Sequence, residues 1–429
     1  MKICVAGLWH LGCVTAACLA ELGLTVIGLD EGETIKSLTN GYTPLYEPGL
    51  NELIQKHIDS NLHFTDNIEE AVSDADFTWI TYDTPVDDND NADVSFVINS
   101  VKTLFPYFRK DVGIIISSQL PVRSTRMLQQ VYLEGCYFPK VVFAYSPENL
   151  RLGGAVNIFL HPDRIVVGSD ESDKSVFAPL FEKISSNIEW MGIESAEMTK
   201  HAINAFLATS ATFANEIASL CEYVGADARQ VARGLKTEKR IGPKAYVAPS
   251  SAIAGGTLNR DMRFLSQLSQ EFSFPAALIH GAINSNERHK LWAVRKLKLE
   301  LGDLDGKKVS VLGLAYKPGT DTLRRSLSIE LCKMLVDAGV QVRAFDPLIK
   351  NLDKPYADFI RLVGHINEVF PGADALVVST ECQEFKGCLK PELIKAMHNK
   401  LLVDANAFLA ADVKDCAEQM KYIVFGGSR

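Results

Sequence analysis

The chain has 429 residues, 47% of them hydrophobic, so it is long enough for two or three domains with well-buried cores. Its formal net charge of -9 and the lack of a Lys/Arg-rich stripe argue against a nucleic-acid partner. The nine cysteines are scattered singly, which indicates neither a disulfide framework nor a zinc site, and we expect no metal. No apolar run reaches membrane length and no export signal precedes the first strand pattern, so we expect a cytoplasmic protein without a membrane partner.

The predicted elements begin with a strand, helix and strand that recur near the end of the chain. Such alternation is typical of parallel strands connected by crossover helices. The second strand of each copy ends in an aspartate, Asp30 or Asp346. The first copy has strand patterns at 2–8 and 24–30 around a helix pattern at 13–22, and the second has strand patterns at 307–314 and 340–346 around a helix pattern at 328–339.

Strand patterns are missing between these copies, where helical periodicity prevails from about residue 194 to residue 298. A long helix is predicted at 196–225, a segment without proline and with glycine only at its last position. We therefore expect an α/β protein with two Rossmann-like, doubly wound parallel-sheet domains, 1–193 and 299–429. A helical central domain, 194–298, would join them and use its long spine helix for dimerisation.

The first βα turn, GLWHLG, resembles the dinucleotide-binding fingerprint GxGxxG. In that fingerprint the glycines allow a tight turn and close packing, and the helix N-terminal amides receive the pyrophosphate. Gly7 and Gly12 are in place, but Trp9 replaces the middle glycine and is followed by His10 and Leu11. We predict a dinucleotide site here, with weak or shifted binding and a structural relic of such a site as open alternatives.

Asp30 stands at the spacing of the acid that hydrogen-bonds the adenosine ribose in such sites. Glu31 and Glu33 add negative charge where a 2′-phosphate would lie, so NAD is favoured over NADP. An aspartate that only caps the next helix is the alternative.

Three further stretches carry residues that suit chemistry. Lys200 and Asn204 are four residues apart and share one face of the long predicted helix. The loop that opens the second copy places Lys317 and Arg324 where anionic groups bind. The stretch AIAGGTLNRD, 252–261, combines two glycines with a threonine and an Arg-Asp pair. The alternatives are a solvated helix face, a structural loop and an ordinary turn.

Together these stretches resemble the UDP-glucose/GDP-mannose dehydrogenase family over nearly the whole chain. The resemblance is specific because many segments agree in order. It implies an N-terminal NAD domain, a helical dimer core, a C-terminal domain for the nucleotide of a sugar nucleotide, and an active site in the cleft. The matching segments include NGYTPLYEPGL, SSQLPVRSTRML, SPENLRLGGA, PDRIVVG, AEMTKHAINAF, RIGPKAYV, GGTLNRD, GLAYKPGTDTLRRS and TECQEF.

The family oxidises a sugar C6 alcohol twice with NAD, through a thiohemiacetal and a thioester on a cysteine. By position, the resemblance assigns Lys200 and Asn204 to the developing oxyanion. It assigns Asp261, with Lys200 and a water, to the alcohol proton, and Glu148 to the surroundings of the reacting sugar. The implied cofactor contacts are Thr84, Gln119, Leu152, Arg260 and Arg324, and the implied substrate contacts are Leu150, Arg151, Arg240, Tyr246, Gly255 and Lys317.

The departures from the family pattern bear on the covalent step. Thr257 stands where the family has its nucleophilic cysteine, Leu152 where it has a second acid, and Gln119 where it has a threonine. The glycines that precede the family's cysteine are replaced in the segment 250–254. An unassisted threonine hydroxyl is neither ionised nor strongly nucleophilic at neutral pH, so the thioester step is expected to be lost.

We therefore expect an NAD-dependent oxidoreductase that acts on a nucleoside-diphosphate sugar, UDP-linked by the resemblance, in a single two-electron alcohol oxidation. A lysine and an amide can stabilise an alkoxide without a cysteine. Two alternatives stay open: an enzyme that retains NAD and epimerises or rearranges the sugar, and a non-catalytic protein that binds NAD or a nucleotide sugar. A homodimer is expected.

Overall fold

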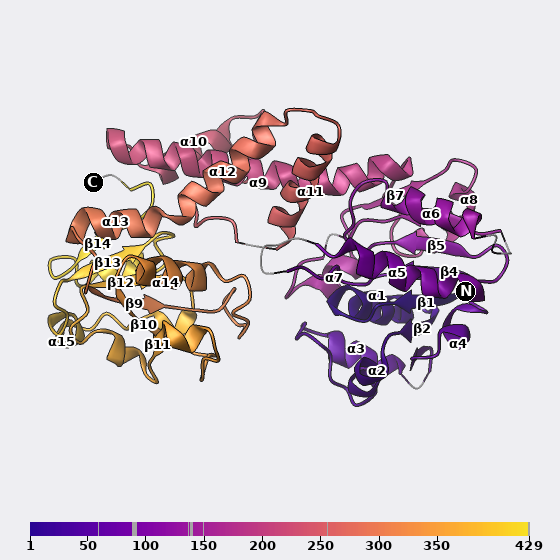
Figure 1. Ribbon diagram of the computed structural model, residues 1–429, viewed down its shortest axis with the longest axis horizontal. Helices are drawn as coiled ribbons and strands as arrows, with labels where there is room; N and C mark the ends of the chain where they lie inside the picture. The colour runs from indigo at the N-terminus through magenta and orange to yellow at the C-terminus, as the bar shows by residue number, and fades with distance from the viewer. Residues whose placement is uncertain are drawn as a thin grey trace. The chain divides into compact units, whose positions relative to one another are not determined.

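The computed structural model describes residues 1–58, 60–87, 92–135, 137, 140–148, 150–254 and 256–427. The chain divides into two compact units, Met1–Ala202 and Ile203–Arg429, and each contains its own sheet (Figure 1). The expected α/β class, with two Rossmann-like sheets and a helical region between them in the sequence, is confirmed. The division into domains 1–193, 194–298 and 299–429 stays a prediction.

The first unit holds an eight-stranded sheet in the order β3-β2-β1-β4-β5-β6-β7-β8. All neighbouring strands are parallel except β6 and β7, which pair antiparallel, a local departure from the expected parallel sheet. The strands are β1 (Lys2–Ala6), β2 (Thr25–Leu29), β3 (Leu62–Thr65), β4 (Phe77–Ile80), β5 (Gly113–Ile116), β6 (Val142–Tyr145), β7 (Ile165–Ser169) and β8 (Ile188–Met191).

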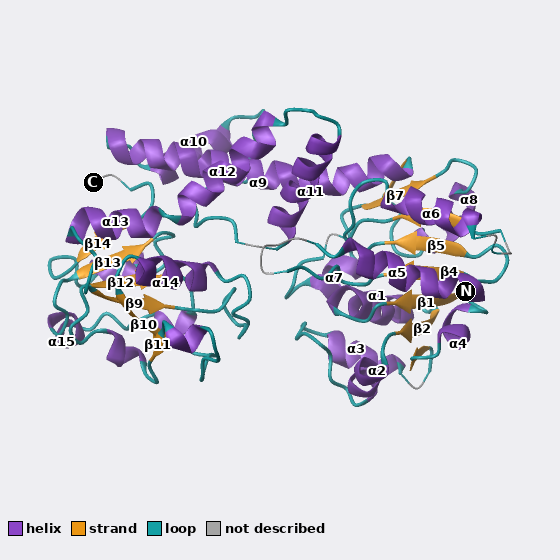
Figure 2. Ribbon diagram, viewed as in Figure 1, coloured by secondary structure: helices purple, strands orange, loops and turns teal. Residues whose placement is uncertain are grey.

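Helices cover both faces of this sheet (Figure 2). Successive side chains of a strand point to opposite faces, so Ile3 and Val5 of β1 join one core while Cys4 and Ala6 join the other. The first core takes in α1 (His10–Glu21), α2 (Gly32–Thr39), α3 (Leu50–His57), α7 (Ala155–Leu160) and α8 (Lys174–Phe181). The second takes in α4 (Ile68–Val72), α5 (Val94–Leu104), the 3₁₀ turn η1 (Phe105–Tyr107), α6 (Ser124–Glu134) and the start of α9 (Ile193–Val224).

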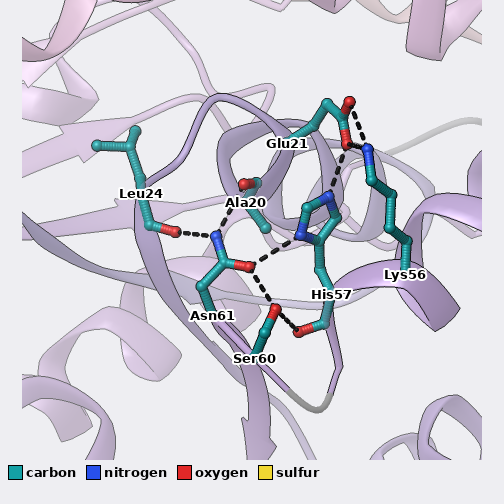
Figure 3. A network of polar contacts seen from close by, with 7 residues as sticks. All are labelled: Ala20, Glu21, Leu24, Lys56, His57, Ser60 and Asn61. Carbon is teal, nitrogen blue, oxygen red and sulfur yellow. Dashed lines mark hydrogen bonds and ion pairs between the residues drawn. The ribbon is translucent and has the colours of Figure 1, made fainter.

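A polar network fixes the C-terminal end of α1 (Figure 3). Asn61 donates two 2.8 Å hydrogen bonds from Nδ2, to the carbonyls of Ala20 and Leu24. Glu21 Oε2 lies 2.6 Å from His57 Nε2 and 2.7 Å from Lys56 Nζ. The C-terminal end of α1 is thereby tied to α3 and to the approach to β3.

The second unit holds a six-stranded, wholly parallel sheet in the order β11-β10-β9-β12-β13-β14. The strands are β9 (Lys308–Leu312), β10 (Gln341–Phe345), β11 (Arg361–Leu362), β12 (Ala375–Val378), β13 (Leu401–Asp404) and β14 (Lys421–Ile423). The helices are α10 (Ala228–Thr237), α11 (Thr257–Glu271), α12 (Ala277–Lys290), α13 (Trp292–Leu301), α14 (Leu327–Asp337), α15 (Pro391–Lys395) and α16 (Ala410–Lys414), with 3₁₀ turns η2 (Tyr356–Asp358), η3 (Ile366–Val369) and η4 (Gln383–Phe385).

The repeat seen in the sequence is a repeat in the structure. The glycine after the first strand of each copy, Gly7 or Gly313, has a positive φ of 96° or 87°. A Cβ at Gly7 would lie 2.6 Å from the Cα of Tyr82, and a Cβ at Gly313 would lie 2.5 Å from the Cβ of Thr380. Only glycine combines this backbone conformation with so close an approach. Each glycine therefore closes the same tight turn against the strand that follows in the sheet.

Candidate active site

The turn between β1 and α1 has the geometry of a pyrophosphate cradle. A Cβ at Gly12 would lie 1.8 Å from the carbonyl oxygen of Gly7, so this position needs a glycine for the helix to start so close to the strand. Among the described residues, no side chain caps the N-terminus of α1 and its first turn has no acidic residue. The first backbone N–H groups of α1 are thus left for an anion.

Helix α14, at the equivalent place in the second unit, is different. Ser326 caps it, because its Oγ accepts a 3.1 Å hydrogen bond from Ser328 N, and Glu330 lies in its first turn. A capped and acidic helix start disfavours a phosphate. Of the two copies, the first is therefore the one whose helix is built to receive a dinucleotide.

Trp9 does not block the turn by its backbone. Its φ and ψ of -79° and -159° are extended values that any residue adopts, so the turn forms without the middle glycine. The residue is 46% exposed, which places the indole toward solvent rather than in the core.

Asp30 holds the same turn from the end of β2. Its Oδ2 accepts a hydrogen bond from Leu8 N and its Oδ1 accepts one of 2.7 Å from Glu31 N. Asp346 does the same in the second unit, where its Oδ2 accepts bonds of 2.8 and 3.0 Å from Leu314 N and Ala315 N. The aspartate at the strand end therefore supports the turn in both copies, and in the first copy this role accompanies the predicted contact to a ribose.

Two side chains of α9 bind the segment between β5 and α6, which contains the predicted cofactor contact Gln119. Glu197 accepts hydrogen bonds of 2.5 Å from Arg123 N and 2.9 Å from Thr125 N, at the start of α6. His201 Nε2 lies 3.0 Å from the carbonyl of Leu120. Burial is the largest influence on Glu197 and raises the pKa of its carboxyl. Sequence reasoning missed both residues, although both lie in the segment AEMTKHAINAF.

The structure brings together two pairs of predicted residues in the first unit. Thr84 Oγ1 donates a 2.7 Å hydrogen bond to the carbonyl of Gln119. Lys200 Nζ donates to the carbonyl of Glu148 at 2.5 Å and to its carboxylate Oε1 at 3.0 Å. The other oxygen of Glu148 accepts a 2.9 Å bond from Leu150 N. Lys200 is thus held, nearly buried, by a glutamate that also shapes the following loop.

A cavity of about 80 Å³ in this unit adjoins both the dinucleotide turn and Glu148. Leu11 of α1 lines it together with Glu148 and Leu150. The rest of the lining is mostly apolar, with Trp79, Phe159 and Phe181 among its walls. Predicted cofactor, catalytic and substrate residues therefore share one cavity within the first unit.

In the second unit, Asn204 and Asp261 form a buried pair. Asn204 Nδ2 donates to Asp261 Oδ2, and the side chain of Asp261 is inaccessible to solvent. Arg260 beside it is also buried. A buried carboxylate needs donors to remain charged, and the amide of Asn204 supplies one.

Thr257 is the first residue of α11 and is exposed. Gly256 before it has a φ of 121°, and a Cβ there would lie 3.2 Å from the hydroxyl of Tyr316. The segment 250–254 is pinned by side chains: Asn286 bonds both the N–H and the carbonyl of Ile253, and Asn406 accepts from Ser251 N at 2.9 Å. The helix that begins at Thr257 thus lies beside the loop of Tyr316, within one unit.

The remaining predicted residues are mostly exposed. Lys317 stands with its Nζ 5.5 Å from the ring centroid of Tyr316, and Arg240 pairs with Glu238 at 2.9 Å. Gly255 lies outside the described residues. Also exposed are the side chains of Arg151, Leu152, Tyr246 and Arg324.

The described cysteines do not supply a nucleophile. All eight are buried, and burial raises the pKa of Cys13 and Cys382, among others, to about 12. Within the described ranges, no group of His, Cys, Asp and Glu is arranged to hold a metal ion. None of the described helices is both long and apolar enough to cross a membrane.

Comparison with known families decides what this arrangement belongs to. Three domain models of the UDP-glucose/GDP-mannose dehydrogenase family match the chain in order: the NAD-binding domain at residues 1–185, the central domain at 194–288 and the UDP-binding domain at 310–411. The chain belongs to this family. It is thus an NAD-dependent nucleotide-sugar dehydrogenase by family, with NAD in the first unit, as the uncapped α1 indicates.

Individual relatives agree with this assignment. The chain is 34% identical over 426 residues to a UDP-glucose 6-dehydrogenase of Rhizobium meliloti, with 94% of both chains covered. It is 33% identical over 401 residues to the UDP-glucose 6-dehydrogenase TuaD of Bacillus subtilis, covering 92% of this chain and 86% of that one. A solved UDP-glucose dehydrogenase from Pyrobaculum islandicum superposes with a TM-score of 0.85 at 28% identity, covering 94% of this chain and 93% of that one.

Proposed function

We propose that this dehydrogenase oxidises one alcohol group of the sugar in a UDP-linked sugar. The oxidation is a single two-electron step without a covalent enzyme intermediate. The observation that carries the proposal is that Lys200 pairs with Glu148 and Asn204 pairs with Asp261, while α11 begins with threonine instead of cysteine. A protein that only binds its ligands has no need of such buried, mutually bonded polar side chains.

NAD, when bound, accepts the hydride that leaves the alcohol carbon. The residues suited to hold it are Gly7, Gly12 and the first N–H groups of α1, with Asp30 toward the ribose. The alcohol must also lose a proton as its carbon becomes a carbonyl. We assign Lys200 Nζ and Asn204 Nδ2 as donors to the oxygen on which negative charge develops. Asp261, with Lys200 and a water, takes the proton, and Glu148 holds Lys200 in place.

The absence of a thiol at position 257 supports a single oxidation. A threonine hydroxyl has no adjacent histidine base in the sequence, and the described cysteines are buried. Leu152 brings no second carboxylate to the loop that follows Glu148. Oxidation to the acid would need the hydrated aldehyde as its substrate rather than a thioester.

For the nucleotide we assign Lys317, Arg240 and Tyr246. Lys317 lies in the stretch matched by the family's UDP-binding domain, and all three side chains are exposed. Lysine and arginine suit a diphosphate because they combine charge with several donors. Arg324 is assigned to NAD, as the resemblance implies.

We also propose a homodimer formed through α9. Phe206, Phe213 and Leu220 recur every seven residues and are 71%, 48% and 59% exposed. Large apolar side chains in such a stripe are expected to be covered by another protein surface, and a second copy presents the same stripe. Phe213→Asp should convert the dimer into monomers in size-exclusion chromatography with light scattering, whereas Phe272→Asp, outside the stripe, should not.

The reaction is tested by incubating the protein with NAD and a panel of UDP-sugars while recording NADH and the mass of the intact protein. The proposal expects NADH with at least one sugar and no covalent adduct. Conversion of the sugar without net NADH would instead indicate an NAD-retaining epimerase. Ligand binding without any conversion would indicate a binding protein.

A further inference from the structure

Glu47 is a buried carboxylate in a loop whose other residues are exposed or partly exposed. The loop runs from the end of α2 to the start of α3, and Tyr46 next to Glu47 is 80% exposed. Glu47 itself is only 3% exposed. A glutamate is rarely buried without partners that compensate its charge. Glu47 lies in the segment NGYTPLYEPGL, and no function was predicted for it from the sequence.

The partners of Glu47 come from two distant parts of the first unit. Its Oε2 lies 2.9 Å from His10 Nε2, at the first residue of α1. The same oxygen accepts a 2.8 Å hydrogen bond from Gly153 N, and Oε1 accepts one of 2.8 Å from Ala155 N. Because an ionised carboxylate only accepts, His10 is the donor of their bond. One carboxylate thus joins the dinucleotide turn to the loop that follows Glu148.

These bonds tie the two segments to each other. Hydrogen bonds to a charged acceptor are short and strong, and a buried N–H that loses its acceptor carries the full desolvation penalty. A shift of the 150–154 loop would pull Glu47 away from His10, and a shift of the turn would pull it away from Gly153 and Ala155. An arrangement of either segment that suits its ligand is therefore transmitted to the other.

We propose that Glu47 is a positioning residue that couples NAD binding to nucleotide-sugar binding. The inference rests on the proposed function, which places NAD at the turn, and on the resemblance, which assigns Leu150 and Arg151 of the 150–154 loop to the substrate. The first ligand to bind orders its own segment and, through Glu47, the segment of the second ligand, whose affinity then rises. Such coupling is reciprocal, so each ligand tightens the other by the same factor.

The coupling is measured with NADH and UDP-glucose, a pair that cannot undergo alcohol oxidation. Calorimetry gives the Kd of NADH with and without saturating UDP-glucose, and the ratio is the coupling factor. We expect a factor of about 5 or more for the unaltered protein, the lower end of typical allosteric coupling. In Glu47→Gln the factor should fall to about 1 while each ligand still binds alone, because one amide oxygen cannot replace two carboxylate oxygens.

Two further variants separate positioning from folding. His10→Leu leaves Glu47 bonded to the 150–154 loop and removes the donor that the turn offers to it within hydrogen-bond distance, so it should reduce the coupling factor as Glu47→Gln does. The double variant should then lose no more coupling than either single one. His10→Leu tests the same link if Glu47→Gln fails to fold.

The matched control is Glu21→Gln, at the opposite end of α1. Glu21 also pairs with a histidine, His57, at 2.6 Å (Figure 3), but it contacts neither the turn nor the loop. Its removal should leave the coupling factor unchanged. Both ligands binding without coupling in the unaltered protein, or full coupling in Glu47→Gln, would overturn the inference alone. Failure of the unaltered protein to bind either ligand would overturn the proposed function and the inference with it.

Discussion

Replacing Lys200 by methionine should remove catalysis and leave the protein folded. Methionine keeps much of the apolar stem and loses the ammonium group, which donates at 2.5 Å to the Glu148 carbonyl and at 3.0 Å to its carboxylate. The carboxylate keeps its bond to Leu150 N. The change therefore removes one charged donor and leaves its partner partly satisfied.

Two effects are expected, a loss of folding stability and a loss of kcat. The side chains of Lys200 and Glu148 are 7% and 22% exposed, so the pair is less buried than those whose disruption costs about 3–5 kcal/mol. We expect a loss of about 1–3 kcal/mol in the free energy of unfolding. A donor to a developing oxyanion is worth about 10²–10³ in kcat, so kcat should fall by about that factor.

The assay is NADH formation under substrate saturation, with NAD affinity measured separately by calorimetry. Lys296→Met is the matched control, because Lys296 pairs with Glu222 at 2.8 Å and their side chains are 15% and 11% exposed. The control should lose similar stability and keep its kcat within about twofold. A kcat for Lys200→Met above about a tenth of the unaltered value would refute the assigned role.

Three further outcomes are expected. Trp9→Gly should tighten NAD binding by about threefold or more in calorimetry, because the backbone can then approach the pyrophosphate; in the unaltered protein, NAD should shield the exposed Trp9 from iodide quenching. Thr257→Ala should keep kcat within about threefold, since the hydroxyl is not the nucleophile, and a loss of activity comparable to that of Lys200→Met would contradict this. Burial raises the pKa of Glu197 in the folded state, so this group's contribution to stability is present below the ordinary glutamate pKa and is lost as pH rises through the raised value. In thermal unfolding at a series of pH values, the advantage of the unaltered protein over Glu197→Gln should therefore narrow with rising pH, and a widening gap would contradict the assignment.

Much of the fold followed from local patterns. In each copy, a first apolar run followed by a glycine and a second apolar run ending in an aspartate predicted a Rossmann-like unit. The structure shows the same positive φ at the two glycines, Gly7 and Gly313. The antiparallel pairing of β6 and β7 could not be foreseen, because the apolar run at residues 165–169 has the same pattern in either direction.

The candidate site was predictable only where residues share an element or a motif. Lys200 and Asn204 were found by helical spacing and family motif together. The role of Glu47 depends on partners such as Gly153, 106 residues away, and Glu197 accepts a hydrogen bond from Thr125 N, 72 residues away in sequence. Such bonds arise from tertiary packing and leave no periodic signal. The extended backbone conformation of Trp9 could not be predicted from the sequence either. The fingerprint gives the usual residue at this position but not the backbone conformations that the turn allows.

The central claim is that the site oxidises its sugar once and without a covalent intermediate. The most direct measurement is the number of NADH molecules formed per UDP-sugar consumed, with the sugar limiting, NAD in excess and an aldehyde trap such as hydroxylamine present. The account predicts one NADH per sugar and a trapped aldehyde. Two NADH per sugar, with no aldehyde trapped and a covalent adduct on the protein, would contradict it.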